Sequence, residues 1–336
     1  MNEQSVFPED LPSSARVTRA EQAGGTEVFT TVETSLPEPG SNQVLVEAAA
    51  TGVNFIETYQ RSGVYPVEYP FIPGSEGAGR VIARGDDVDG MELGQRVTTS
   101  EAATGTYSTH FLVDAAAKAV PVPDDITDEQ AAALPLQGAT AHYLINSTYR
   151  VAPGETVLTH AGAGGVGQIL TQLLKAKGAR VITTTSTPEK ADIAQAAGAD
   201  YVLTYDSFAE EVLEITKGEG VSVVYDGVGK DTFTGSLESL GVRGTMVLFG
   251  GASGQVPALD LQELNRRGGL FVTRPALHWY LRNAEERAWR FSELFKAVTD
   301  GDLSLSVGDT YPLAEAGRAH DDLENRRTTG KLLLVP

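Results

Sequence analysis

A strand, a glycine-rich turn and an amphipathic helix follow one another in the middle of the chain, and this run constrains the fold more than any other feature. The apolar segment 156–159 leads into Gly162-Ala163-Gly164-Gly165-Val166-Gly167, which has glycine at each glycine position of the pattern G-x-G-x-x-G. Apolar residues then recur at helical spacing, at Val166, Ile169, Leu170, Leu173 and Leu174. This order predicts a dinucleotide-binding turn at the start of a βαβ unit.

Each glycine of the pattern has a physical reason in such a turn. Gly162 allows the chain to turn tightly after the strand, and Gly164 lets the backbone approach a pyrophosphate group. Gly167 lets the helix pack closely on the strand, while the helix that begins near Gly165 and Val166 presents its N-terminus to the anion. We therefore expect a nicotinamide dinucleotide as the cofactor, held by the backbone from Gly162 to Gly167.

The end of the second strand indicates which nicotinamide dinucleotide is bound. A site that prefers NAD holds an acidic residue about 20 residues past the glycines, where it binds the ribose hydroxyls. Here the strand ends in Thr183-Thr184-Thr185-Ser186, and Lys190 follows one helical turn later, in a position to meet a 2′-phosphate. We therefore predict NADPH. Ser186 and Glu189 could also form a capping box for the next helix, and this capping role is compatible with cofactor binding by the same segment.

The rest of the chain divides into two kinds of sequence. Short β-type runs separated by turns extend to about residue 136, and apolar runs alternate with helical stretches beyond it. We predict an α/β protein with a flexible extension at 1–13, a β-rich catalytic domain at 14–136 and 279–336, and a Rossmann domain, a doubly wound parallel sheet, at 137–278. The six expected strands of that sheet are Thr156–Thr159, Arg180–Thr184, Tyr201–Thr204, Val221–Tyr225, Thr245–Phe249 and Leu270–Val272.

Composition argues against several classes of protein and of active site. The chain has no cysteine, and therefore no disulfide, no thiolate nucleophile and no zinc site built on thiolates. Its net charge of −19 repels phosphate backbones, so nucleic acid is not an expected partner. We find no membrane span and no secretory signal, and so expect a cytoplasmic protein. The five histidines show no metal-ligand spacing, so we interpret them as structural and expect no metal.

Several segments resemble one known family. The run Val53-Asn54-Phe55-Ile56-Glu57-Thr58-Tyr59, followed by Arg61-Ser62-Gly63-Val64-Tyr65-Pro66, is similar to the segment that marks zeta-crystallin-like NADPH:quinone oxidoreductases, a zinc-free branch of the medium-chain dehydrogenase/reductase superfamily. The likeness continues through 73–79, the glycine turn, 224–229, 249–250, 272–275 and 318–320. Ser75 stands where zinc-dependent relatives carry a histidine.

The resemblance implies a chaperonin-10-like (GroES-like) catalytic domain, with the active site in the cleft between the two domains. Asn54 and Tyr59 would orient the nicotinamide or donate to the acceptor oxygen, and Tyr65 would form a wall of the pocket. For either tyrosine, ordinary packing is the alternative. Outside the glycine turn, the cofactor contacts implied are Asn54, Thr140, Ser186, Lys190, Tyr205, Phe249, Gly250, Gly251 and Arg326, of which Lys190, Tyr205 and Arg326 would meet the 2′-phosphate.

The chemistry of a site without metal narrows the substrate. Hydride reduction of an isolated ketone creates a basic alkoxide, which needs a metal ion or a positioned acid. A quinone or another conjugated carbonyl delocalises the charge, so hydrogen-bond donors and proximity suffice. We predict NADPH-dependent reduction of quinones, with two alternatives: a reductase of the double bond in enones or enals, and a nucleotide-binding protein without turnover. The resemblance also implies a homodimer joined near 270–273, although the chain itself could cover that sheet edge.

Overall fold

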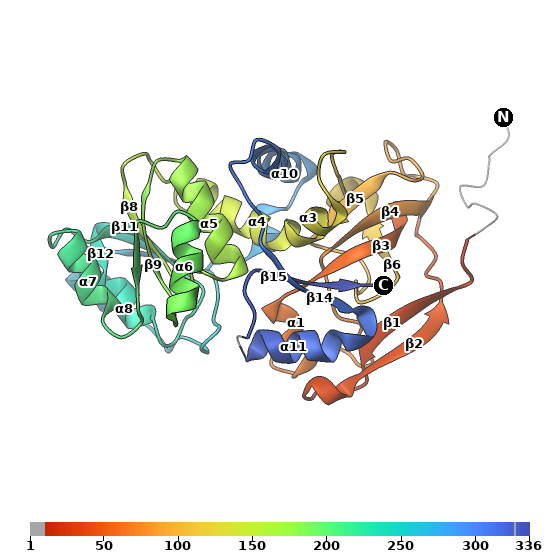
Figure 1. Cartoon of the computed structure of the whole chain (residues 1–336), viewed down its shortest axis with the longest axis horizontal. Coiled ribbons are helices and arrows are strands. Elements are labelled where there is room, and N and C mark those ends of the chain that lie inside the picture. The colour runs from red at the N-terminus through yellow and green to blue at the C-terminus, as the bar shows by residue number, and fades with distance from the viewer. Residues whose placement is uncertain (1–10, 326) are drawn as a thin grey trace. The chain divides into compact units, whose positions relative to one another are not determined.

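The computed structural model describes residues 11–325 and 327–336 (Figure 1), so most of the predicted flexible extension lies outside the described part. The chain divides into two compact units. The first unit contains the residues up to Leu136 together with Asn283–Phe295 and Leu305–Pro336, and the second contains Gln137–Arg282 and Lys296–Ser304. We expected 279–282 and 296–304 in the catalytic domain, whereas the structure groups them with the second unit.

The second unit is built on a sheet of six parallel strands. They are β8 (Thr156–Thr159), β9 (Arg180–Thr184), β10 (Tyr201–Leu203), β11 (Val221–Asp226), β12 (Leu240–Leu248) and β13 (Phe271–Thr273). Their order is β10-β9-β8-β11-β12-β13, and every neighbouring pair is parallel. This is the order of a doubly wound dinucleotide-binding fold, so the predicted Rossmann class is confirmed.

Helices pack on the strands of this sheet (Figure 1). The helix α5 (Gly165–Ala176) contacts β9, and α6 (Pro188–Ala196) contacts both α5 and β10. The helix α8 (Phe233–Glu238) contacts β11, β12 and its neighbour α7 (Phe208–Ile215). The strands read as continuous apolar runs because helices cover both faces of such a sheet. Leu158, Ile182, Val224 and Met246 accordingly form part of one buried core.

The first unit is rich in β-structure. Its seven-stranded sheet has the order β14 (Val307–Pro312), β15 (Lys331–Val335), β3 (Gln43–Val53), β4 (Gly77–Arg84), β5 (Arg96–Thr99) and β7 (Val120–Pro121), with β6 (His110–Asp114) also paired to β3. A separate hairpin joins β1 (Ser14–Ala20) and β2 (Phe29–Ser35). The C-terminal strand β15 runs antiparallel to β3, with Leu333 opposite Gly52. The end of the chain therefore completes the sheet that carries Asn54 at the end of β3.

The remaining helices are mostly short. They are α1 (Phe55–Arg61), α2 (Ala115–Lys118), α3 (Asp128–Ala133), α4 (Pro135–Tyr143), α9 (Leu261–Arg266), α10 (Ala284–Thr299) and α11 (Ala316–Glu324). Single helical turns lie at 26–28, 277–280 and 313–315, and a π-helical turn lies at 144–148. Figure 1 shows α11 beside α1, and the two helices are in contact. Among the described residues, no helix has the length and apolar character needed to cross a membrane.

Candidate active site

The carboxyl ends of the parallel strands gather several of the residues predicted to hold the cofactor. The glycine turn follows β8, Ser186 follows β9, Tyr205 follows β10, and Phe249 follows β12. Because the strands are parallel, these ends lie along the same edge of the sheet. The strand order reverses beside β8: β9 and β10 lie on one side of it, and the chain then crosses to β11 on the other side. Ligands of open α/β sheets bind at this kind of topological switch point.

The three pattern glycines of the turn, Gly162, Gly164 and Gly167, face different surroundings. A Cβ added to Gly162 would lie 2.5 Å from Thr183 Oγ1, and one added to Gly167 would lie 2.9 Å from Gly162 Cα. A Cβ on Gly164 would meet only the Ala161 carbonyl oxygen, at 3.2 Å, and Gly164 has an ordinary φ of −74° as the N-cap of α5. Packing therefore requires glycine at Gly162 and Gly167. Gly164 is the least crowded of the three, which suits a turn that admits a pyrophosphate.

The region expected to hold the 2′-phosphate lies at the ends of β9 and β10. Thr185 N donates to Leu203 O at 2.9 Å, which joins the two strand ends. The N-cap of α6 is Thr187, whose Oγ1 accepts from Lys190 N at 3.3 Å. The prediction that Ser186 caps this helix is therefore wrong, and the N-cap lies one residue later. The chain turns into the helix one residue later, which leaves Ser186 exposed. The ring of Tyr205 stacks on His160, with centroids 6.1 Å apart.

The turn after β12 is held against the end of β11. Asp226 O accepts from Phe249 N at 2.9 Å and from Gly250 N at 3.3 Å. A Cβ on Gly227 would lie 2.8 Å from Phe249 Cζ, so the glycine allows the ring to pack there. Thr140, on α4, is buried. Arg326 lies outside the described residues.

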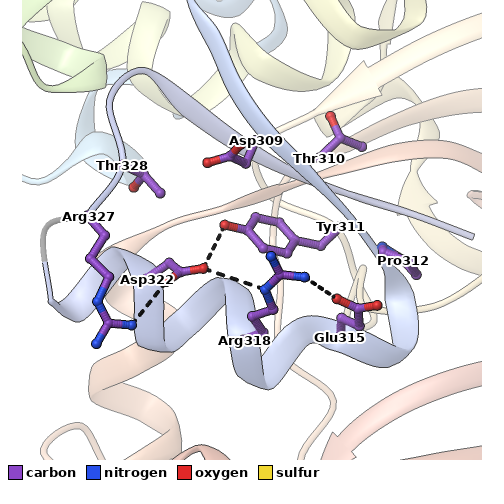
Figure 2. A pocket seen from close by; sticks show the side chains of 9 residues that line it. All are labelled: Asp309, Thr310, Tyr311, Pro312, Glu315, Arg318, Asp322, Arg327 and Thr328. Carbon is purple, nitrogen blue, oxygen red and sulfur yellow. Dashed lines mark hydrogen bonds and ion pairs between the residues drawn. The ribbon is translucent and has the colours of Figure 1, made fainter.

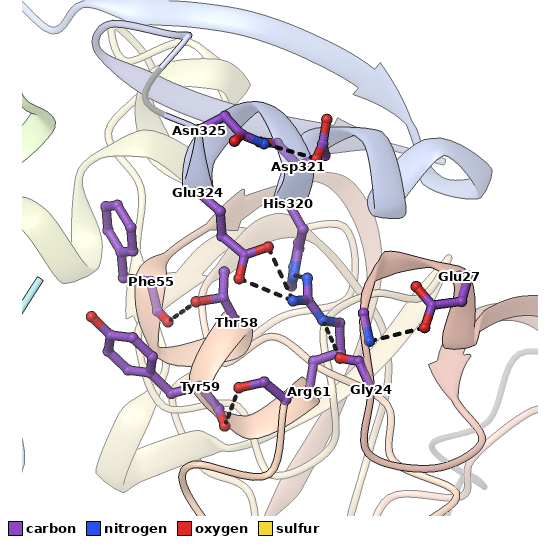
Figure 3. Close-up of polar contacts among 12 residues, drawn as sticks. Gly24, Glu27, Phe55, Thr58, Tyr59, Arg61, His320, Asp321, Glu324 and Asn325 are labelled. Atoms are coloured by element: carbon purple, nitrogen blue, oxygen red, sulfur yellow. Dashed lines mark hydrogen bonds and ion pairs between the residues drawn. The ribbon is translucent and has the colours of Figure 1, made fainter. Parts of the chain in front are cut away.

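Asn54 and Tyr59 belong to the start and the middle of α1 in the first unit, and Tyr65 follows that helix. Asn54 is the N-cap of α1, and its backbone N donates to Glu57 Oε2 at 2.7 Å. Tyr59 lies on α1, and its ring meets that of Tyr65 edge to face with centroids 5.4 Å apart. Figure 3 shows Phe55 and Tyr59 on the same side of the helix, with ring centroids 6.4 Å apart. Burial, followed by the nearby Tyr65 and Glu324, raises the pKa of Tyr59, so its hydroxyl remains a hydrogen-bond donor at neutral pH.

The last turn of α1 is tied to α11 by a buried guanidinium that sequence reasoning missed (Figure 3). Arg61 Nη2 binds both oxygens of Glu324, at 2.9 and 3.0 Å, and Arg61 Nη1 donates to His320 Nδ1 at 3.1 Å. His320 Nε2 lies 2.8 Å from the Tyr107 hydroxyl. Burial and the adjacent Arg61 lower the pKa of His320 to about 3, so the imidazole is neutral. These contacts fix the helix that carries Tyr59.

A second set of residues missed by sequence reasoning surrounds Asn54. Lys331 Nζ donates to Asn54 Oδ1 at 2.6 Å and pairs with Glu76, while Asn54 Nδ2 donates to Glu76 Oε2 at 3.0 Å. Glu76 Oε1 accepts from Leu136 N at 2.6 Å. The spacing of Asn54 and Glu57 at the start of a helix could have signalled their capping contact. Glu76 and Lys331 stand 255 positions apart, and no sequence pattern joins them.

A polar pocket of the first unit lies elsewhere, between β14 and α11 (Figure 2). Its lining residues are Asp309, Thr310, Tyr311, Pro312, Glu315, Arg318, Asp322, Arg327 and Thr328. Arg318 pairs with Glu315 at 3.0 Å and lies 5.4 Å over the ring of Tyr311, while Arg327 pairs with Asp322 at 3.1 Å. Carboxylates thus compensate both guanidinium groups. None of the predicted site residues that the structure describes lines this pocket.

Comparison with known proteins identifies the family. Residues 40–124 match the alcohol dehydrogenase GroES-like domain, and residues 165–285 match the domain family described as zinc-binding dehydrogenase. Quinone oxidoreductase of Salmonella typhimurium is 45% identical over 320 residues, which cover 93% of this chain and 97% of that protein. The chain belongs to the quinone oxidoreductase family.

One solved structure and one further relative also match nearly the whole chain. The structure of Escherichia coli quinone oxidoreductase complexed with NADPH has a TM-score of 0.93 and 43% identity, with 96% of this chain and all of that chain covered. The 2-haloacrylate reductase of a Burkholderia species is 42% identical over 93% of this chain and 96% of its own length. Membership in the medium-chain dehydrogenase/reductase superfamily, predicted from the segments around Asn54, is confirmed. Within the described residues, no group of three or more His, Cys, Asp or Glu side chains could hold a metal ion.

Proposed function

We propose that the protein reduces quinones with NADPH. The observation that carries the proposal is the glycine turn at the start of α5, in which Gly164 is the least crowded of the pattern glycines, in a chain of the quinone oxidoreductase family. Relatives that match nearly the whole chain are quinone oxidoreductases, and one of them has been solved in complex with NADPH. The function predicted from the sequence is therefore the one that the family supports.

The residues at the carboxyl edge of the Rossmann sheet fit the proposed cofactor. NADPH, when bound, supplies the hydride. The lightly crowded turn at Gly164 and the amides at the start of α5 suit its pyrophosphate. In this proposal Lys190, Tyr205 and Ser186 bind the 2′-phosphate, and Arg326 is assigned to the same group. Thr140 and the turn Phe249-Gly250-Gly251 hold other parts of the cofactor.

Asn54, Tyr59 and Tyr65 serve the nicotinamide and the acceptor in this proposal. The raised pKa of Tyr59 keeps its hydroxyl protonated, and a protonated hydroxyl can donate to the acceptor oxygen as charge develops there. Asn54 orients the nicotinamide or donates to the same oxygen, and Tyr65 forms a wall. Because a quinone delocalises the incoming negative charge, hydrogen-bond donors of this kind can stabilise the reduced acceptor without a metal ion.

An acceptor screen tests the function. The purified protein is given NADPH with an ortho-quinone, a para-quinone or a simple enone, and NADPH oxidation is followed by absorbance, with NADH as the matched control. We expect turnover with a quinone and a higher KM for NADH. NADPH binding in a calorimeter with no acceptor reduced would instead favour a nucleotide-binding protein without turnover.

One observation favours a second candidate reaction. The 2-haloacrylate reductase is nearly as similar to this chain as the quinone oxidoreductases are. Reduction of an activated carbon–carbon double bond uses the same cofactor site and the same kind of charge delocalisation. A larger kcat/KM with the enone than with either quinone would select this alternative.

We also propose a homodimer joined through β13. This strand ends the sheet, and its Phe271 is 60% exposed, while Val242 on neighbouring β12 is 77% exposed. An open apolar strand edge is stabilised when a second copy covers it. A monomeric mass in light scattering would reject the dimer. A cytoplasmic location belongs to the same proposal and is tested by cell fractionation.

A further inference from the structure

Four side chains form a buried polar cluster at the start of α1. They are Asn54 and Glu57 of the N-terminal turn, Glu76 just before β4, and Lys331 at the start of β15, and each is at most 7% exposed. Strand β3 encloses the cluster through Gly52, where an added Cβ would lie 2.7 Å from Lys331 Cε and 2.9 Å from Glu76 Cδ. The cluster therefore occupies a closed space with little room to rearrange.

The cluster fixes the Asn54 carboxamide in one orientation. An ammonium group only donates hydrogen bonds and a carboxylate only accepts them. Lys331 Nζ meets Asn54 Oδ1 at 2.6 Å, and Glu76 Oε2 meets Asn54 Nδ2 at 3.0 Å. A flipped amide would place its NH₂ against the ammonium and its oxygen against the carboxylate, and both hydrogen bonds would be lost. Lys331 and Glu76 thus determine which way Asn54 faces.

The cluster has more acids than bases. Glu57 and Glu76 face a single ammonium, that of Lys331, and the remaining Glu57 oxygen, Oε1, is buried without a hydrogen-bond partner. Burial raises the pKa of Glu57 to about 7, with Lys331 opposing the rise and Glu76 adding to it. A proton on Oε1 leaves the cluster with one negative and one positive charge, which is the arrangement that burial favours.

The other charged and titratable groups around the cluster leave this balance unchanged. Arg61, on the same helix as Glu57, is paired with Glu324 of α11. His320 of α11 is neutral, because burial and Arg61 lower its pKa to about 3. Tyr107, which precedes β6, is neutral as well, because burial raises its pKa well above the ordinary value. The proton therefore belongs to Glu57.

We propose that Lys331 and Glu76 are positioning residues for the reaction, which hold the Asn54 carboxamide in its working orientation, and that Glu57 carries the proton that keeps this cluster neutral. The inference rests on the proposed function, because it needs Asn54 to contact the nicotinamide or the acceptor. It follows that ionisation of Glu57 disturbs the hydrogen bonds of Lys331 and hence the position of Asn54.

Steady-state kinetics of Lys331→Met test the positioning role. Quinone reduction by this variant should show kcat lowered about tenfold or more, because misplacing a reacting group by about 1 Å costs that much. Lys118→Met, a partly exposed lysine of the same unit, is the matched control and should retain wild-type kcat and KM. A folded Lys331→Met with wild-type kcat overturns the proposal. If it fails to fold, the charge-balanced Lys331→Met/Glu76→Gln replaces it, and wild-type kcat in that double variant overturns the proposal in the same way.

Glu57→Gln tests the proton. The wild-type kcat should fall as the pH rises through about 7, and this limb should be missing in Glu57→Gln. Infrared difference spectra between about pH 6 and about pH 8 should show the carbonyl band of a protonated carboxylic acid, lost in the variant. Identical spectra of the two proteins overturn the assignment. If the wild type reduces no quinone, the proposed function and the positioning role both fail, while the spectra still decide where the proton lies.

Discussion

Replacing Glu57 with glutamine should remove a pH dependence of stability between about pH 4.5 and about pH 7. Burial raises the pKa of Glu57 from 4.5 to about 7 in the folded protein, whereas the unfolded chain has the ordinary value. Over this interval the folded state holds a proton that the unfolded state has released, so the free energy of unfolding falls as the pH rises. At about 1.4 kcal/mol for each pH unit, the wild type loses about 3 kcal/mol across the interval.

Urea denaturation of the wild type and of Glu57→Gln at about pH 5 and about pH 8 measures this loss. Other groups titrate in both proteins, so their contribution cancels in the difference between the two free energies of unfolding. The variant should gain about 2 to 3 kcal/mol relative to the wild type at the higher pH. Glu68→Gln, which changes an exposed carboxylate, is the control and should follow the wild type. A constant difference between Glu57→Gln and the wild type would refute the reasoning.

Four further predictions concern the nucleotide site and the sheet edge. Gly164→Ala should weaken NADPH binding in calorimetry by roughly tenfold or more with little loss of stability, because its Cβ meets only the Ala161 carbonyl oxygen, at 3.2 Å, and occupies space where the pyrophosphate is expected. Gly167→Ala should instead lower the free energy of unfolding by about 1–3 kcal/mol, because its Cβ overlaps the turn. Lys190→Ala should raise the KM for NADPH by about tenfold and leave the KM for NADH nearly unchanged, because one charged hydrogen bond to phosphate contributes about 1.5–3 kcal/mol. An equal rise of both KM values would contradict the assignment of Lys190 to the 2′-phosphate. Phe271→Asp should yield a monomer in light scattering, and a dimer of unchanged mass would exclude β13 from the interface.

Much of the Rossmann unit could be predicted because its determinants are local in the chain. The strand 156–159, the glycines Gly162, Gly164 and Gly167, and the apolar face of α5 stand within about two dozen residues of one another. Their spacing follows from the geometry of a strand, a tight turn and a helix, so the order of residues is enough. The segment around Asn54, Tyr59 and Tyr65 is also local in the chain, and its sequence indicated the family that the comparisons confirm.

The start of α6 shows where local reasoning is less accurate. Ser186 and Thr187 are both suitable N-cap residues, and the sequence does not decide between them. The structure assigns the cap to Thr187, because the backbone becomes helical one residue later than the spacing of Ser186 and Glu189 had indicated. Helix boundaries depend on the direction in which the preceding strand ends, which is a property of the whole sheet.

The sequence by itself determined the class of the fold, the phosphate-binding turn and the residues expected at the nicotinamide. Only the tertiary structure decided what surrounds those residues. Lys331 and Glu76 meet at Asn54 because β15 pairs with β3, and Arg61 meets His320 because α11 packs on α1. The pKa of Glu57 depends on the same burial and the same neighbours. Burial and electrostatic interactions depend on distance in space, and chain positions 255 residues apart carry no local pattern that records such a distance.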